Sequence, residues 1–338
     1  MDAIFIQVLN GLDKGAAYAL IALGLTLAFG TLGIVNFAHG VLFMLGAFCA
    51  VSVSKILTIS QKVRDENITF FEAYKEIPYL EIWWGDTGTA IIDYVVPISI
   101  LFTIPIMALI GISMERGLIR FFYKRTHAEQ ILVTFGLAIV VQEIVKHFYG
   151  ANPIPISAPD IVSGSAPIGA MLGLGDTLVY PWWRLIYFVF SVAVIGGVFS
   201  FLKYTTYGMV VRAGMADRDT VGLLGINIQR RFTIVFALAA VVAGLAGAMY
   251  TPIVAPDYHM GMNFLVLSFV VVVVGGMGSL PGAVAAGFLL GILESFASMN
   301  EVKQIIPGID QIIIYLVAVA ILLLRPRGLM GRKGVMED

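Results

Sequence analysis

Charged residues and cysteine are both scarce in this chain. Of its 338 residues only 13% are Asp, Glu, Lys or Arg and 59% are hydrophobic, whereas soluble domains carry about 25% charged residues. A globular protein of this size in water needs charged residues over most of its surface. The composition therefore excludes a water-soluble globular protein and predicts a membrane protein. The single cysteine, Cys49, excludes a disulfide framework and a multi-cysteine metal site. The net charge of −1 gives no reason to expect a nucleic-acid partner.

Catalytic motifs are absent as well. The dipeptide Gly-Lys never occurs, so the chain has no P-loop, and its four histidines form no H-E-x-x-H pair. We therefore expect a protein that is not an enzyme, binds no cofactor or metal of its own and hydrolyses no ATP itself.

Long apolar runs are abundant. A membrane crossing needs about 20 apolar residues, which predicts single crossings at 95–114, 131–149, 185–202, 232–253 and 305–324. The runs 15–54 and 258–293 are too long for one crossing, and each contains a glycine-rich break, at 30–40 and 275–282. The predicted fold is a single all-α domain over 1–338, a polytopic transmembrane bundle of about eight or nine segments with broken or re-entrant helices at both breaks.

Basic residues predict the orientation of the bundle. When the crossings alternate, three basic segments share one side, at 116–125, 203–231 and 325–333, and the positive-inside rule makes that side cytoplasmic. The acidic segment 55–94 and both Trp-Trp pairs then lie outside. This arrangement predicts a periplasmic N-terminus, a cytoplasmic C-terminus, an outer insertion at 55–94 and a cytoplasmic loop at 204–230.

The first break places polar side chains at membrane depth. Asn36 and His39 precede Gly40 there, and a polar break is tolerated in lipid only where it is buried in protein or lines a cavity. Two interpretations stay open for Asn36 and His39. They form a helix cap with a buried core histidine, or they line a translocation path.

The second break also has two interpretations. Its glycines Gly275, Gly276 and Gly278 leave backbone amides free to face a cavity, and Ser279 can open a helix whose N–H groups attract carboxylates. Alternatively, the small residues allow close helix packing. Glu294, near the end of the same apolar run, is either held by a structural hydrogen bond or contacts substrate.

The most informative polar segment is the loop 207–227. It mixes charges with an apolar pattern of helical spacing, including Met209, Val210 and Ala213. A short amphipathic helix on the cytoplasmic face suits docking to a partner protein. The alternative is a helix that lies on lipid headgroups.

Several motifs in order resemble the permease subunits of branched-chain amino acid ABC importers. These motifs are Gly11–Gly24, Asn36-Phe-Ala-His-Gly40, Arg212–Asn227, Val272–Ala283 and Arg325-Pro-Arg-Gly-Leu329, and together they cover nearly the whole chain. The resemblance implies a multi-pass protein of the bacterial inner membrane. Its partners would be a second, related or identical permease, two cytoplasmic ATPases that carry ATP and Mg²⁺, and a periplasmic substrate-binding protein.

The resemblance also implies roles for residues. The loop would engage the ATPase through a coupling helix, with the candidate residues Tyr207, Gly208, Arg212, Ala213, Asp217, Leu224 and Gly225. The candidates for the substrate path are Asn36, His39, Gly40, Gly275, Gly276, Gly278, Ser279 and Glu294. The expected substrates are branched-chain or other hydrophobic amino acids delivered by the binding protein.

Two departures from the family pattern limit the expectation. Val41 follows Gly40 where relatives usually have Glu, and the insertion 55–94 is longer than the usual loop. Relatives also serve urea, short amides and aromatic acids, so the same mechanism with one of these substrates stays open. A stand-alone secondary transporter or channel is the alternative from another class, although the chain offers few intramembrane acids besides Glu143 and Glu294.

Overall fold

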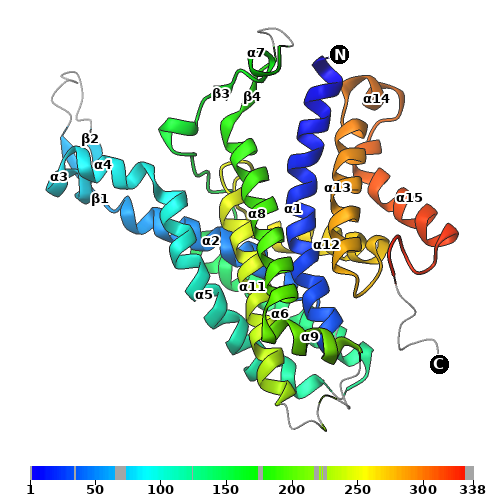
Figure 1. Ribbon diagram of the computed structural model, residues 1–338. Helices are drawn as coiled ribbons and strands as arrows, with labels where there is room; N and C mark the ends of the chain where they lie inside the picture. Colours follow the sequence, from blue (N-terminus) through cyan, green and yellow to red (C-terminus); the bar gives the residue numbers. More distant parts are fainter. Residues whose placement is uncertain are drawn as a thin grey trace.

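The computed structural model describes residues 2–33, 36–64, 74–123, 125–173, 178–216, 221, 223 and 227–331. Most of them are helical (Figure 1). The longer helices are α1 (Asp2–Leu32), α2 (His39–Leu57), α5 (Val95–Gly117), α6 (His127–Tyr149), α8 (Trp182–Tyr204), α9 (Thr206–Ala216), α11 (Ile228–Tyr250), α12 (Met260–Gly275), α13 (Leu280–Ala297) and α15 (Ile309–Leu324).

Seven of these helices are long and apolar enough to cross a membrane, namely α1, α2, α5, α6, α8, α11 and α13. Two shorter apolar helices, α12 and α15, have 16 residues each, whereas a crossing takes about 20. The predicted all-α polytopic bundle is therefore confirmed. Each long apolar run also divides at its predicted break, into α1 and α2 and into α12 and α13.

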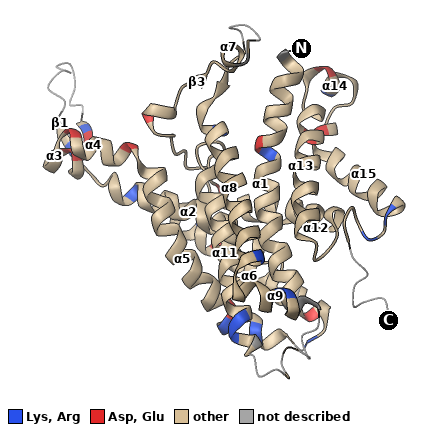
Figure 2. Cartoon of the chain, in the orientation of Figure 1, with Lys and Arg blue, Asp and Glu red and all other residues tan. Residues whose placement is uncertain are grey.

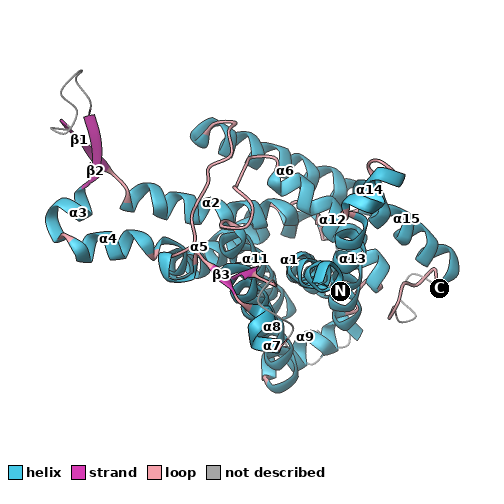
Figure 3. Ribbon diagram, turned by 90° about the horizontal axis from the view of Figure 1, so that it is seen from above, coloured by secondary structure: helices cyan, strands magenta, loops and turns pink. Residues whose placement is uncertain are grey.

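Helix α1 lies in the middle of the bundle. Seen along its axis it is enclosed by α8, α11, α12 and α13 (Figure 3). Its closest neighbour is α13, and small residues permit the approach, because a Cβ placed on Gly291 would lie 2.4 Å from the Cα of Gly15. Similarly, a Cβ on Gly287 would lie 2.8 Å from the Cα of Ala19. This is the small-residue packing by which membrane helices associate.

Helix α2 begins beside the middle of α1 rather than beyond its end. A Cβ on Gly24 would lie 2.8 Å from Nε2 of His39, the first residue of α2. Gly24 is eight residues before the end of α1, which corresponds to about 12 Å along a helix. The chain therefore folds back along α1 at the first break, and this places His39 at the depth of the apolar helices.

The segment predicted as an outer insertion, 55–94, has structure of its own where it is described. It contains a hairpin of β1 (Ser60–Arg64) and β2 (Tyr74–Pro78), in which Ser60 pairs with Pro78, followed by α3 (Tyr79–Trp84) and α4 (Asp86–Asp93). It projects sideways from the bundle at the outer end of α2 (Figure 1). Trp83 and Trp84 are exposed there, at 70% and 58%, which suits indoles at a headgroup interface.

The remaining elements are short. They are the 3₁₀ helices η1 (Ile119–Phe122) and η2 (Asp160–Val162), a two-residue pairing of β3 (Ser165–Ala166) with β4 (Tyr180–Pro181), α7 (Ile168–Leu172) and α14 (Asn300–Ile305). Lys and Arg gather at the end of the bundle near α9, whereas acidic residues are frequent near α4 and α14 at the opposite end (Figure 2).

Candidate functional site

Asn36 organises the first break. Its side-chain Oδ1 accepts a hydrogen bond from the N–H of Ala38 at 3.0 Å, and its carbonyl accepts one from the N–H of His39 at 3.2 Å. Thr134 of α6 holds the same turn, because its Oγ1 accepts from the N–H of Phe37 at 3.1 Å. The turn before α2 is therefore fixed by an Asn side chain and tied to a third helix.

His39 and Asn36 also present polar atoms that are not paired. Both residues are buried, His39 completely. Among the described residues, neither ring nitrogen of His39 nor the Nδ2 of Asn36 has a hydrogen-bond partner of normal geometry. A buried polar group without a partner costs about 1–3 kcal/mol. Gly40 beside them has no free face, because a Cβ there would lie 2.2 Å from the carbonyl oxygen of Gly261 in α12.

The second break is closely packed on one side. A Cβ on Gly275 would lie 2.5 Å from the backbone of Gly282, and a Cβ on Gly276 would lie 2.4 Å from the backbone nitrogen of Gly331. The N–H groups of Leu329 and Met330 donate to the carbonyls of Val274 and Gly275 at 2.8 and 3.0 Å. The segment after α15 therefore binds the end of α12 through its backbone.

Gly278 is the open part of this break. It has φ of +81° and a Cβ there would meet nothing within 4 Å, and the neighbouring Met277 is 51% exposed. Ser279 is the N-cap of α13, with its hydroxyl accepting from the N–H of Gly282 at 3.2 Å. The break thus combines a packed face with an exposed turn.

A Ser279→Ala substitution should destabilise the protein by about 1 kcal/mol, because it removes the side-chain acceptor of a helix N-cap. Thermal unfolding in detergent measures the change. Ser298→Ala is the matched control at the other end of α13: the Ser298 hydroxyl donates to the Glu294 carbonyl four residues back, so its loss should change stability by less than about 0.5 kcal/mol. Equal losses in the two variants would contradict the capping role.

The structure does not bring the two breaks together within one chain. Helix α12 lies between them, since Gly40 contacts Gly261 near its start and Gly275 is its last residue. These positions are about 21 Å apart along a helix of 1.5 Å rise. A path that touches both breaks would therefore run along α12.

Glu294 belongs to a polar cluster at the middle of α1. Its carboxylate forms an ion pair with Lys14 at 2.9 Å and accepts a hydrogen bond from the hydroxyl of Tyr18. Asp13, which is 2% exposed, lies 3.6 Å from Arg184 of α8. The cluster joins α1 to α8 on one side and to α13 on the other.

Tyr180 lies beside this cluster in β4. Burial, together with the nearby Asp13 carboxylate, raises the pKa of its phenol to about 12. Tyr180 is therefore neutral at physiological pH.

The predicted coupling segment forms α9 up to Ala216. Its buried stripe consists of Gly208, Val211 and Gly214, and Gly208 permits close contact with α8, because a Cβ there would lie 2.2 Å from the carbonyl oxygen of Leu202. The exposed residues of α9 include Tyr207, Met209, Arg212 and Ala213. The candidates Asp217, Leu224 and Gly225 lie outside the described residues.

Three charged residues of the helix contacts were not singled out from the sequence: the buried Asp13 and Glu115, and the partly buried Arg184. Glu115 is completely buried in α5, where the hydroxyls of Tyr123 and Thr233 donate to its carboxylate at 2.5 and 2.7 Å. A signal for Asp13 was available, because an Asp-Lys pair inside an apolar helix is costly unless both charges find partners.

Together, these features define the class of protein. A bundle of apolar helices, with two irregular breaks at membrane depth and a short helix displayed at its basic end, is a polytopic membrane transport protein. Residues 7–322 match the model of the permease component of branched-chain amino acid transport systems. The chain belongs to this permease family.

Curated relatives support the assignment. The chain is 28% identical to the high-affinity branched-chain amino acid transport permease BraD of Pseudomonas aeruginosa, over 97% of this chain and 96% of the relative. It is 26% identical to LivH of Escherichia coli K12, over the same shares. A probable LivH of Methanocaldococcus jannaschii is 24% identical, over 92% of this chain and 88% of the relative. No solved structure matches the chain.

Proposed function

We propose that this chain is the permease subunit of an ATP-driven importer and forms the translocation path for branched-chain or other hydrophobic amino acids. The match to the permease family over residues 7–322 carries this proposal. The substrate class comes from the relatives, which are named as branched-chain amino acid permeases. The proposed partners are a second permease, two cytoplasmic ATPases that bind ATP and Mg²⁺, and a periplasmic binding protein.

The charge distribution supports an orientation. Basic residues concentrate at the end of the bundle that carries α9, and the N-terminus lies at the other end (Figure 2). By the positive-inside rule α9 faces the cytoplasm and the N-terminus faces the periplasm of a bacterial inner membrane.

Coupling is proposed to occur through α9. A helix that buries one stripe against the bundle and exposes Met209, Arg212 and Ala213 can be pushed by a partner without unfolding. The Arg231 guanidinium lies 4.0 Å from the centre of the Tyr207 ring, so the start of α9 is also held to α11. Movement of the ATPases would reach the bundle through these contacts.

The polar atoms at the first break support a role in the path. Two buried side chains, Asn36 and His39, hold polar atoms that have no hydrogen-bond partner of normal geometry among the described residues. Such groups are expensive at membrane depth and are characteristic of substrate pathways. A passing amino acid, or water that accompanies it, would supply the missing partners. Gly275, Gly276, Gly278, Ser279 and Glu294 remain proposed path residues as well.

Alanine at Arg212 tests the coupling. We expect Arg212→Ala to lower ATP-driven uptake of labelled leucine severalfold in liposomes that contain the complete importer, while the chain still inserts and purifies normally. Lys203→Ala is the control, because Lys203 is exposed at the end of α8, with its ammonium 5.2 Å from the centre of the neighbouring Tyr204 ring. Full uptake by Arg212→Ala would refute the coupling role. Uptake by this chain alone, without ATP, would refute the importer itself.

A further inference from the structure

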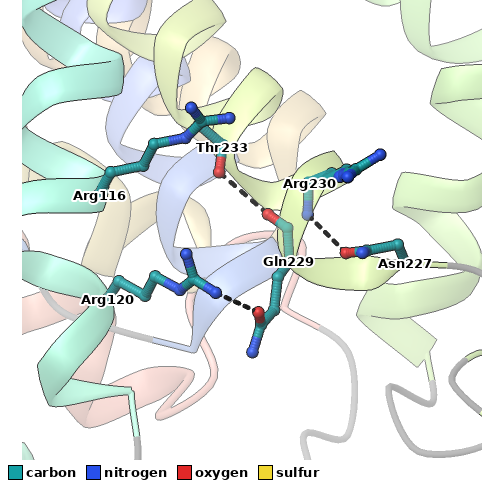
Figure 4. A pocket seen from close by; sticks show the side chains of 6 residues that line it. All are labelled: Arg116, Arg120, Asn227, Gln229, Arg230 and Thr233. Atoms are coloured by element: carbon teal, nitrogen blue, oxygen red, sulfur yellow. Dashed lines mark hydrogen bonds between the residues drawn. The ribbon is translucent and has the colours of Figure 1, made fainter.

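A polar cavity of about 340 Å³ opens at the basic end of the bundle. Its lining residues come from the ends of α5 and η1 and from the start of α11: Arg116, Arg120, Asn227, Gln229, Arg230 and Thr233. Figure 4 shows Arg116 and Arg120 reaching from one wall toward α11, whereas the side chain of Arg230 leaves α11 in another direction. The volume is at the lower end of the range for small-ligand sites.

Among the described residues, little negative charge compensates the arginines of this cavity. Three of its six lining residues are arginines and none is acidic. Within the described part of the chain, no carboxylate forms an ion pair with Arg116, Arg120 or Arg230, and all three are exposed. Arg120 donates to Gln229 Oε1 at 2.5 Å, which fixes its guanidinium at the cavity wall.

Glu115 precedes the lining residue Arg116 in the sequence, but its carboxylate does not compensate the arginines of the cavity. Its two carboxylate oxygens already accept from the hydroxyls of Tyr123 and Thr233, and its side chain is completely buried. Glu115 therefore does not neutralise the three arginines of the cavity, and even if its charge is counted, positive charge remains in excess among the described residues. It is suited to an anion that presents several acceptor oxygens, as a phosphate group does.

An apolar stripe on the surface of α5 leads to Arg116, one of the arginines that line the cavity. Phe102, Ile106 and Leu109 are 52%, 41% and 66% exposed, and Arg116 follows Leu109 about two helical turns later on the same face of α5. Residues at this spacing lie on one face of a helix. Leu109 and Arg116 are about 10 Å apart along the axis. One surface thus offers apolar contact at membrane depth and guanidinium groups where the apolar helix ends.

We propose that this cavity binds the phosphodiester headgroup of an anionic phospholipid, whose acyl chains lie along the α5 stripe. Basic pockets between membrane helices at an interface are suited to such headgroups. A free phosphate would use the arginines but has no use for the apolar stripe. An acidic segment of a cytoplasmic protein would likewise leave the stripe unpartnered.

Lipid binding to the purified full-length chain tests the proposal. In detergent, native mass spectrometry would follow binding of phosphatidylglycerol and, separately, of phosphatidylcholine. We expect a preference for phosphatidylglycerol that falls about 30-fold in the double variant Arg116→Gln/Arg120→Gln, since each basic residue near an anionic surface contributes roughly fivefold. The Arg116→Lys/Arg120→Lys variant should retain a clear part of the preference, because it keeps the charge but not the planar fork.

Controls separate the alternatives. Lys203→Gln removes a basic residue from the same end of the bundle, outside the cavity, and should leave the preference unchanged. An unchanged preference in the double Gln variant, with a normal thermal unfolding profile, would overturn the proposal. Glycerol phosphate, which has no acyl chains, should not displace the lipid at equal concentration; if it did, the site would be one for soluble phosphates. Exclusion of bound lipid by an added ATPase subunit would assign the cavity to that protein.

Discussion

Gly46→Ala should leave little or no folded protein. The added Cβ would lie 2.0 Å from the carbonyl oxygen of Gly244 and 2.3 Å from its Cα, so α2 and α11 would have to separate. Backbone atoms cannot rotate away as a side chain can, and α2 is also fixed where Gly247 meets the carbonyl of Phe43. Overpacking in a core costs about 1–3 kcal/mol and occasionally more. Because two helix backbones are in contact at Gly46, we expect the cost there to reach or exceed the upper end of this range.

The measurement is the yield of monodisperse protein from detergent and its thermal unfolding. Gly136→Ala in α6 is the control, because a Cβ there meets nothing within 4 Å. Alanine should be neutral at that position or stabilise the helix by up to about 1 kcal/mol. If Gly46→Ala unfolded at the wild-type temperature, the close crossing of α2 over α11 would be wrong.

The helices themselves could be predicted because lipid imposes a simple rule on sequence. A crossing segment must satisfy its backbone internally and expose apolar side chains, so long apolar runs reveal it. The run 258–293 was correctly divided at its glycines, since α12 ends at Gly275 and α13 begins at Leu280. Predicting the separation of α1 from α2 worked for the same reason.

Contacts between distant segments could not be predicted in this way. The tail motif at 325–329 was recognised, but its binding to the end of α12 depends on backbone hydrogen bonds from Leu329 and Met330. Nearly every residue has the same backbone N–H and C=O groups, so contacts between backbones cannot be predicted from composition or periodicity. The partners of Glu294 were hidden for a related reason, because Lys14 is 280 positions away. The polar cavity at the basic end of the bundle likewise brings Arg116 and Arg120 together with residues 227–233, more than 100 positions further along the chain.

Arg184→Met should destabilise the protein by about 3 kcal/mol, the lower end of the cost of removing one partner from a buried ion pair, because Asp13 is buried but the Arg184 side chain is 34% exposed. Asp13 is 2% exposed and depends on Arg184, 3.6 Å away, for compensation of its charge. In the described residues its other oxygen, Oδ1, has no hydrogen-bond partner. The variant would therefore leave a carboxylate buried between α1 and α8, and it would also break the hydrogen bond that Arg184 donates to Asn10 at 3.1 Å.

The double variant Asp13→Asn/Arg184→Met distinguishes loss of charge balance from loss of packing. It removes the stranded charge and should recover most of the stability, as measured by denaturation with SDS in mixed micelles. Lys62→Met is the exposed control: its pair with Glu76 spans 3.9 Å, with side chains 73% and 63% exposed, and such pairs contribute at most about 1 kcal/mol. If the double variant were as unstable as Arg184→Met alone, the arginine would stabilise α8 by its packing, and the ion pair with Asp13 would not be what holds α1 and α8 together.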